Sequence, residues 1–137
     1  MPHKHMLLNQ QKLGRLIPVH VTHIRKRLDE EYQSLSYLKQ HKQDYLNQYD
    51  QLFRFITIWL LIKGYDLTNH QPHQVLKAVC LYNCPDWDID LIVQQRHLLK
   101  KRFAENANLT SVIELQHCLH FFDCSLQAYD SVSNENI

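Results

Sequence analysis

Apolar residues recur every three or four positions through most of the chain, a spacing that is typical of amphipathic helices. The first long stripe lies between His20 and Leu38, where charged residues fill most of the intervening positions. A second stripe begins near Tyr45 and widens until the stretch from Phe55 to Ile62 is almost entirely apolar. Because a helix that is apolar on nearly all faces is buried on several sides, we expect a helix from about Tyr45 to Lys63 to be the central element.

The segment from Lys39 to Asp44 is wholly polar and separates these two stripes. We interpret it as a loop or bend that divides residues 20–63 into two helices, with one continuous helix as the alternative. A single helix over that whole stretch would be far longer than the roughly three to four turns that are usual in globular proteins. At the other end, Gly64 suits the left-handed residue that follows many helices.

Three more helices are predicted downstream. Pro72 is well placed in the first turn of one helix, Asn83-Cys84-Pro85 ends it, and the next helix has a core face that includes Leu99 and Phe103. The last helix follows the connector Asn106-Ala107-Asn108. The expected caps, in chain order, are Asn69 or His70, Asp86, and Thr110 or Ser111, with Glu114 able to complete a capping box.

These elements predict an all-α fold, a single helical bundle of five or six helices with an N-terminal helical arm. The pattern indicates no convincing strand, and Tyr65 to Gln71 is interpreted as a loop. Two glycines and four prolines in the whole chain also disfavour sandwiches and barrels, which need frequent turn residues. We expect one domain over residues 1–137, with residues 1–18 as a lead-in segment and residues 131–137 as a disordered tail.

Composition narrows the class of protein only slightly. The 15 basic and 14 acidic residues give a net charge of +1, so any contact with nucleic acid has to depend on a local patch. The longest apolar run, Leu52 to Ile62, is shorter than the roughly 20 residues that span a bilayer, and we expect no membrane association. Four cysteines fit a reducing compartment, so we expect a cytoplasmic protein in which Cys80 and Cys84 are buried thiols.

Ten histidines raise the question of a metal site. A diiron bundle needs a glutamate-x-x-histidine motif on two helices, and Glu114 with His117 supplies the only candidate of this kind. Other residues with useful spacings are His20 with His23 and His70 with His73. On the last helix His117, His120 and Cys124 share a face, whereas Cys118 points about 100° away. We interpret these as surface or partly buried side chains and predict no metal and no cofactor. The chain also lacks the glycine-rich motifs of nucleophile elbows and phosphate-binding loops.

The basic run from Arg96 to Arg102 is the strongest candidate for chemistry. Arg96 and Lys100 are four residues apart and form one basic edge of a helix, with His97 and Lys101 on an adjoining edge. An arginine and a histidine could hold a phosphate and move a proton, which is the minimum for cleaving RNA by attack of its own 2′-hydroxyl group. The alternative is a solvated helix end whose cations complement the helix dipole.

From Tyr45 to Tyr129 the layout resembles the HEPN superfamily (higher eukaryotes and prokaryotes nucleotide-binding), whose members are small all-helical bundles. The resemblance consists of the apolar helix that ends in Leu60-Leu61-Ile62-Lys63-Gly64, the helix opened by Asn69 to Leu76, and the helix with Gln95-Arg96-His97. It implies a homodimer in which the arginine helices face each other. It also implies a link to toxin–antitoxin systems, in which several such domains are RNases beside a small nucleotidyltransferase partner.

The family's catalytic pattern is an arginine, a polar residue and then a histidine four to six places after the arginine. Arg96 and His97 match the first two positions, but the third falls at Lys100, Lys101 or Arg102. The resemblance therefore implies a domain that is non-catalytic or weakly catalytic and binds RNA, a nucleotide or a cognate protein partner. In this hypothesis Arg96 clamps a phosphate, His97 is the candidate proton carrier, and Lys100, Lys101 and Arg102 attract the phosphate backbone.

A second hypothesis makes the chain an adaptor or immunity-type interaction module. Its binding surface would be the tyrosine- and glutamine-rich stretch from Tyr32 to Tyr49. Tyrosine is favoured at interfaces because it buries a large area and keeps a polar tip.

Overall fold

The computed structural model describes residues 2–135, and within them six helices pack as a bundle beside a two-stranded sheet. The prediction of an all-α helical bundle is confirmed. In chain order the elements are α1 (Pro2–Lys12), β1 (Leu16–Pro18), α2 (Val21–Lys39), α3 (Tyr45–Ile62), β2 (Tyr65–Leu67), α4 (Pro72–Asn83), α5 (Ile89–Lys100) and α6 (Leu109–Glu135).

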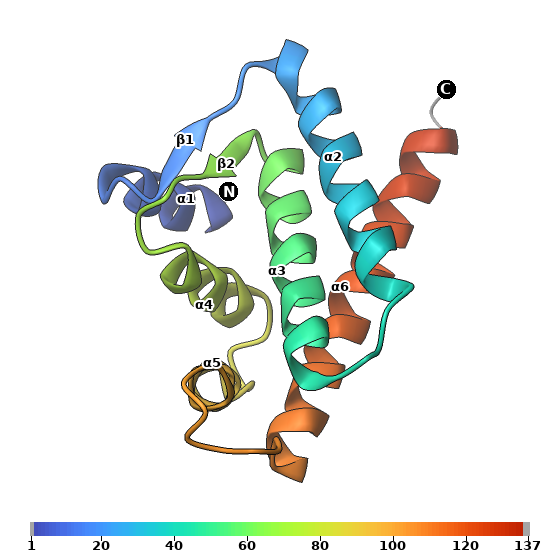
Figure 1. The fold of residues 1–137 in the computed structure, drawn as a ribbon. Helices are drawn as coiled ribbons and strands as arrows, with labels where there is room; N and C mark the ends of the chain where they lie inside the picture. Colours follow the sequence, from blue (N-terminus) through green and yellow to red (C-terminus); the bar gives the residue numbers. More distant parts are fainter. Residues whose placement is uncertain (1, 136–137) are drawn as a thin grey trace.

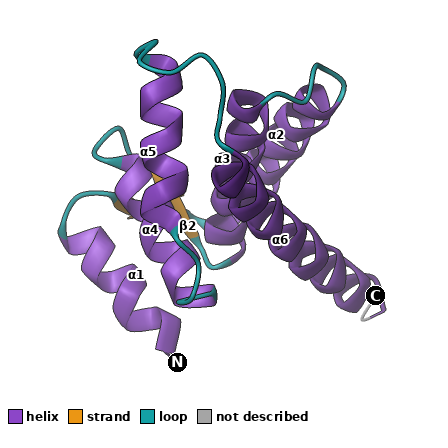
Figure 2. Cartoon of the chain, turned by 90° about the horizontal axis from the view of Figure 1, so that it is seen from below, coloured by secondary structure: helices purple, strands orange, loops and turns teal. Residues whose placement is uncertain are grey.

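Helix α3 is the central element, as its apolar pattern predicts. In Figure 1, α2 lies along one side of α3, α4 and α5 lie on the other side, and α6 runs behind it. The view from below in Figure 2 keeps α5 and α2 on opposite sides of α3. In the second half of α3 buried residues occupy almost every face. The buried residues of the whole helix are Tyr45, Tyr49, Gln51, Leu52, Phe55, Ile56, Thr57, Ile58, Leu60 and Leu61.

The division of residues 20–63 into two helices is also confirmed. His20 caps α2 by accepting a hydrogen bond from the backbone N–H of Thr22, and Asp44 caps α3 by accepting one from Asn47. At the C-terminus of α3, Gly64 has a φ of +94°, which a residue with a Cβ rarely adopts. The polar segment between the helices therefore reverses the chain and lets α2 pack antiparallel to α3 (Figure 1).

The absence of strands was a wrong prediction. β1 and β2 pair antiparallel, with Leu16 opposite Leu67 and Pro18 opposite Tyr65, so part of the expected loop from Tyr65 to Gln71 is a strand. Each strand has only three residues, which is too short for a period of two to be recognised in the sequence. The pairing ties the N-terminal segment to the segment between α3 and α4.

The cap predictions were wrong at three helices, each time by one or a few residues. α4 is preceded by Gln71, which has a φ of +48° and whose side chain accepts two hydrogen bonds from the Arg15 guanidinium. α5 is capped by Asp88 because residues 84–87 form a turn first. α6 follows Asn108, whose side chain accepts from the N–H of Ser111.

The two ends of the described chain are helical. The N-terminal arm is α1, which packs on β1 and α4 and buries Leu7. At the other end, residues 131–135 belong to α6 although a tail is predicted there, and residues 136–137 lie outside the described part. Among the described helices, none combines the length and the apolar character that crossing a membrane requires.

Candidate nucleic-acid interface

Helix α5 positions the predicted basic residues at one end of the molecule. Its core face consists of Ile89, Ile92 and Gln95, which are buried against the rest of the bundle. Arg96 follows this stripe directly and is therefore half-buried at its border. The C-terminal half of α5 thus carries cations beside the core, as the spacing predicts.

The guanidinium group of Arg96 lies over the ring of Tyr49 in α3, with its central carbon 5.0 Å from the ring centroid. The Tyr49 side chain is completely buried. A guanidinium group that stacks on an aromatic ring uses its face for that contact and keeps the N–H donors of its edge for other partners. Among the described residues, no ion pair and no hydrogen bond involves the five N–H donors of Arg96, so these donors can bind an anion.

A histidine from α4 completes this cluster. The Tyr49 hydroxyl group and Nδ1 of His73 are 2.8 Å apart, and the His73 ring packs 5.4 Å from the ring of Phe53. Burial lowers the pKa of His73, the positive charge of Arg96 lowers it further, and Asp50 opposes the shift. Burial also raises the pKa of Tyr49, so at neutral pH both groups are uncharged and Arg96 is the cation of the cluster.

The remaining predicted phosphate-binding residues surround the end of α5. Lys100 is its last residue, Lys101 is its C-cap, and Arg102 follows with a φ of +60°. The N–H of Arg102 donates to the carbonyl of Leu99 and that of Phe103 to the carbonyl of Leu98, which is the Schellman arrangement with arginine where glycine is usual. All three cations are exposed, and no ion pair among the described residues involves them.

Phe103 corrects a prediction. The spacing places it on the core face of α5, but the helix ends before it and its side chain is 75 % exposed. The turn at Arg102 changes the chain direction, so the period of the helix no longer applies at residue 103. An aromatic side chain therefore stands beside three free cations.

A hollow of about 570 Å³ adjoins Arg102, between the start of α3 and the loop that leads to α6. Its walls combine the apolar atoms of Tyr45, Leu46 and Leu99 with polar groups from Asp44, Glu105 and Asn106. The size lies within the range of small-molecule sites, which is roughly 300–1,000 Å³. A base or a sugar could occupy this hollow while its phosphate meets the adjacent cations.

His97, the predicted proton carrier, lies apart from the cluster. It is exposed and follows Arg96 on the same helix, so the two side chains leave the helix axis about 100° apart. The histidine that the structure brings close to Arg96 is His73. The sequence flags His73 only as a partner of His70 at metal-ligand spacing, and nothing in the spacing of residues 49, 73 and 96 announces their contact.

The other candidate chemistry does not come together in the described part of the chain. Nowhere there do three or more histidine, cysteine or acidic side chains gather in a way that could hold a metal ion. His120 and Cys124 are neighbours on α6, with Sγ 3.6 Å from Nε2, but both are exposed. Cys80 and Cys118 are fully buried thiols, and their mutual contact and burial raise the pKa of Cys118. The prediction of a buried thiol is confirmed for Cys80, whereas Cys84 is half-buried.

The chain matches no protein-family model, no curated protein and no solved structure.

Proposed function

We propose that this chain is an RNA-binding domain, HEPN-like in its layout, that holds phosphate groups at the C-terminal end of α5. One observation supports this most directly. Arg96 is fixed by stacking on the buried ring of Tyr49, yet its hydrogen-bonding edge is unused by the described part of the protein. An arginine that is held in place while its donors stay free is suited to bidentate recognition of phosphate.

The surrounding charges favour a polyanion over a single small anion. Lys100, Lys101 and Arg102 extend the positive charge from Arg96 to the exposed tip of the loop. Contacts of this kind to the phosphate backbone position a nucleic acid without reading its sequence. The hollow beside Arg102 offers a place for an unpaired base, so we favour single-stranded RNA as the ligand.

Binding is proposed here without cleavage. The candidate catalytic pair of Arg96 and His97 is divided between two sides of α5, and His73 is engaged by Tyr49. Cleavage of RNA by attack of its own 2′-hydroxyl group needs a general base within hydrogen-bond reach of that hydroxyl group. A Tyr49-bound His73 with a lowered pKa could fill this role only through Nε2, and its half-buried ring limits access.

Two further parts of the proposal follow from the resemblance. A homodimer with facing arginine helices would place two copies of the Arg96 cluster on one RNA strand, and a cognate protein partner could cover the same surface. RNA binding would also place the chain in the cytoplasm, where its four cysteines would remain the free thiols that the structure contains.

The interaction-module hypothesis has less support from the geometry. Tyr45 and Tyr49, two of the tyrosines that would form its surface, belong to the core. Tyr37 is the strongly exposed tyrosine of that stretch, with 63 % of its side chain accessible. The stretch from Tyr32 to Tyr49 therefore offers a smaller aromatic surface than its composition suggests.

The test is the affinity of a short fluorescent single-stranded RNA for the wild type, Arg96→Ala and Arg96→Lys, measured by anisotropy. We expect Arg96→Ala to weaken binding by at least about tenfold, because one charge-assisted contact is worth about 1.5–3 kcal/mol. Arg96→Lys should recover only part of this loss, since lysine lacks the planar fork. The matched control is Arg25→Ala, which removes an exposed arginine of α2. Equal affinities for all four proteins would refute the proposal, and a ladder of RNA fragments would show that cleavage also occurs.

A further inference from the structure

A second charged surface lies between α2 and α3 and adjoins the Arg96 cluster at Phe53, whose ring packs against His73. A groove of about 650 Å³ runs between α2 and α3, and a smaller hollow of about 320 Å³ continues it toward the loop before α4. Phe53 and Arg54 line both hollows and make them one continuous surface. We call this surface, with Glu30, Tyr37 and Asp50 at its wider end, the acidic groove.

The two arginines of the groove are already neutralised. Glu31 is only 3 % exposed, and its carboxylate accepts from Arg54 at 3.0 and 3.2 Å and from Arg27 at 2.9 Å. Arg27 also pairs with Asp66 of β2 at 2.7 Å. The buried carboxylate of Glu31 and the half-buried carboxylate of Asp66, at such distances, cancel most of the field of both guanidinium groups.

Two carboxylates remain at the open end of the groove. Asp50 is exposed and takes part in no ion pair among the described residues, whereas Glu30 has one longer contact of 3.4 Å to Arg27. The aromatic rings of Tyr37 and Phe53 stand beside them. Carboxylates next to aromatic faces form a surface that attracts cationic side chains through charge and through cation–π contact.

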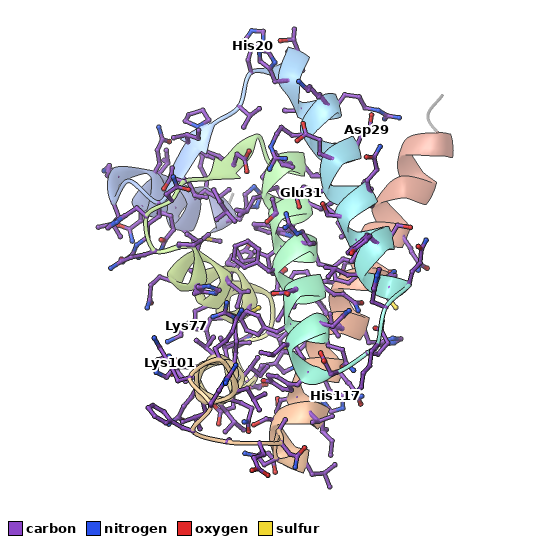
Figure 3. All side chains as sticks on the ribbon, in the orientation of Figure 1. His20, Asp29, Glu31, Lys77, Lys101 and His117 are labelled. Atoms are coloured by element: carbon purple, nitrogen blue, oxygen red, sulfur yellow. The ribbon has the colours of Figure 1, made fainter. Side chains whose placement is uncertain are left out.

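The chain itself presents a matching segment at the end of α5. We call residues Lys100, Lys101, Arg102 and Phe103 the basic tip. One tight turn presents the three free cations there together with the Phe103 side chain, which is 75 % exposed. Figure 3 shows Lys101 beside α5 and Glu31 between α2 and α3, and α5 and α2 lie on opposite sides of α3 in Figures 1 and 2. Among the described residues, no ion pair joins the basic tip to the acidic groove of the same molecule.

We propose that the acidic groove of one copy docks the basic tip of a second copy. Lys101 and Arg102 would meet Glu30 and Asp50, and Phe103 would pack against the rings that line the groove. The two surfaces differ, so the contact is heterologous and leaves a free tip and a free groove on each pair. Such association proceeds beyond a dimer unless it closes into a ring. It differs in this respect from the symmetric dimer that the family resemblance implies.

This association has a consequence for the proposed RNA site. The basic tip supplies cations to both contacts, so RNA and a second copy of the chain would compete for it. This consequence rests on the proposed function, whereas the docking itself does not. Added RNA would then dissociate the assemblies into complexes of one protein molecule with RNA.

Sedimentation velocity over a range of protein concentrations, at low and at high salt, tests the docking. We expect a concentration-dependent series of species at low salt that shifts toward the monomer at high salt, because the contact is between exposed charges. The reversals Asp50→Lys and Lys101→Glu should each weaken association about tenfold or more, and the double variant should restore at least half of that loss.

Asp86→Lys and Lys26→Glu are the matched controls, since they make the same charge changes at exposed positions outside both surfaces. They should leave association unchanged. A monomer at every concentration in low salt would overturn the proposal, as would an oligomer that responds equally to the test and control reversals or that the double variant fails to restore. RNA binding by a strictly monomeric protein would overturn the docking alone and leave the proposed function in place.

Discussion

Tyr49 connects the core of the bundle to its charged surface. Its ring is buried in α3, its face carries the Arg96 guanidinium, and its hydroxyl group meets His73. A buried tyrosine usually finds a partner for its hydroxyl group, because an unpaired polar atom in the core is costly. Here that partner also fixes the orientation of the histidine nearest to the candidate phosphate clamp.

Replacing Tyr49 by phenylalanine separates these two roles. We expect Tyr49→Phe to lower the free energy of unfolding by about 1 kcal/mol, since one buried hydrogen bond to His73 is lost. RNA affinity should change little, because the phenyl ring still supports Arg96. Urea unfolding and RNA anisotropy measure the two effects, with Tyr82→Phe at an exposed site as the control. A large loss of affinity would show that the hydroxyl group itself contacts the ligand.

The protonation of His73 gives the fold a pH dependence. Burial holds its pKa below the usual 6.5, with Arg96 acting in the same direction and Asp50 against it. As the pH falls below 6.5 the unfolded chain takes up a proton that the folded chain resists. The contribution of this site to stability is therefore complete above pH 6.5 and is lost as the pH falls through the folded-state pKa.

We expect the free energy of unfolding to decline from pH 7 toward acid, and to decline less steeply in His73→Gln. Urea titrations on both sides of pH 6.5 measure the two slopes. His3 also has a lowered pKa, so some slope should persist in the variant. Identical slopes for the variant and the wild type would contradict the assignment to His73.

At the scale of elements, the end of α5 shows a conflict between local structure and charge. Arg102, the residue after the C-cap of α5, has the left-handed conformation that Gly64 has after the C-cap of α3. A left-handed residue with a Cβ costs about 1 kcal/mol relative to glycine. Strain of this kind at an exposed basic residue is consistent with a role of the side chain in binding.

Arg102→Gly should therefore raise the free energy of unfolding by up to about 1 kcal/mol while it weakens RNA binding. Arg102→Ala is the matched control, because it removes the same charge but keeps the strained backbone. RNA anisotropy should show a loss of affinity in both variants. Thermal melts should show a gain in stability for Arg102→Gly alone. Undiminished RNA affinity in both variants would remove Arg102 from the site.

The long helices were predictable because each carries its own signal. The apolar faces of α3 recur over five turns, and Gly64 and Asn83-Cys84-Pro85 mark helix ends in the residues themselves. The paired strands were not predictable, since Leu16 and Leu67 come together through the packing of α1 against β1 and of α3 against β2. The left-handed turn at Arg102 was not predictable from the sequence either, because an arginine gives no sign that its φ is positive.

The candidate site was predictable only in part. Arg96 and the cations after it follow from helix spacing, because they share one element. Tyr49 and His73 join them through contacts between α3, α4 and α5. Contacts between different helices cannot be predicted from the spacing of residues along one chain segment. The histidine that sequence spacing selected, His97, is the neighbour of Arg96 in the chain, and the histidine near it in space is His73.

For the whole molecule, a net charge of +1 conceals two opposite surfaces. In the acidic groove beside α2, Asp50 takes part in no ion pair among the described residues and Glu30 has one contact of 3.4 Å, while the cations at the basic tip of α5 have none. Helix α2, which lines the groove, and helix α5, which ends in the tip, lie on opposite sides of the central helix α3 in both views of the ribbon. The net charge therefore excludes neither anionic nor cationic partners of this chain. The support for a polyanionic ligand comes from the local distribution of charge.

The salt dependence of RNA affinity tests the central claim most directly. Each phosphate contact to single-stranded RNA contributes about −0.7 to the slope of log affinity against log salt concentration. Arg96, Lys100, Lys101 and Arg102 together predict a slope near −3 for the wild type, and the Arg96→Ala variant should be shallower by about one contact. A flat dependence, or the same slope in both proteins, would contradict phosphate binding at the end of α5.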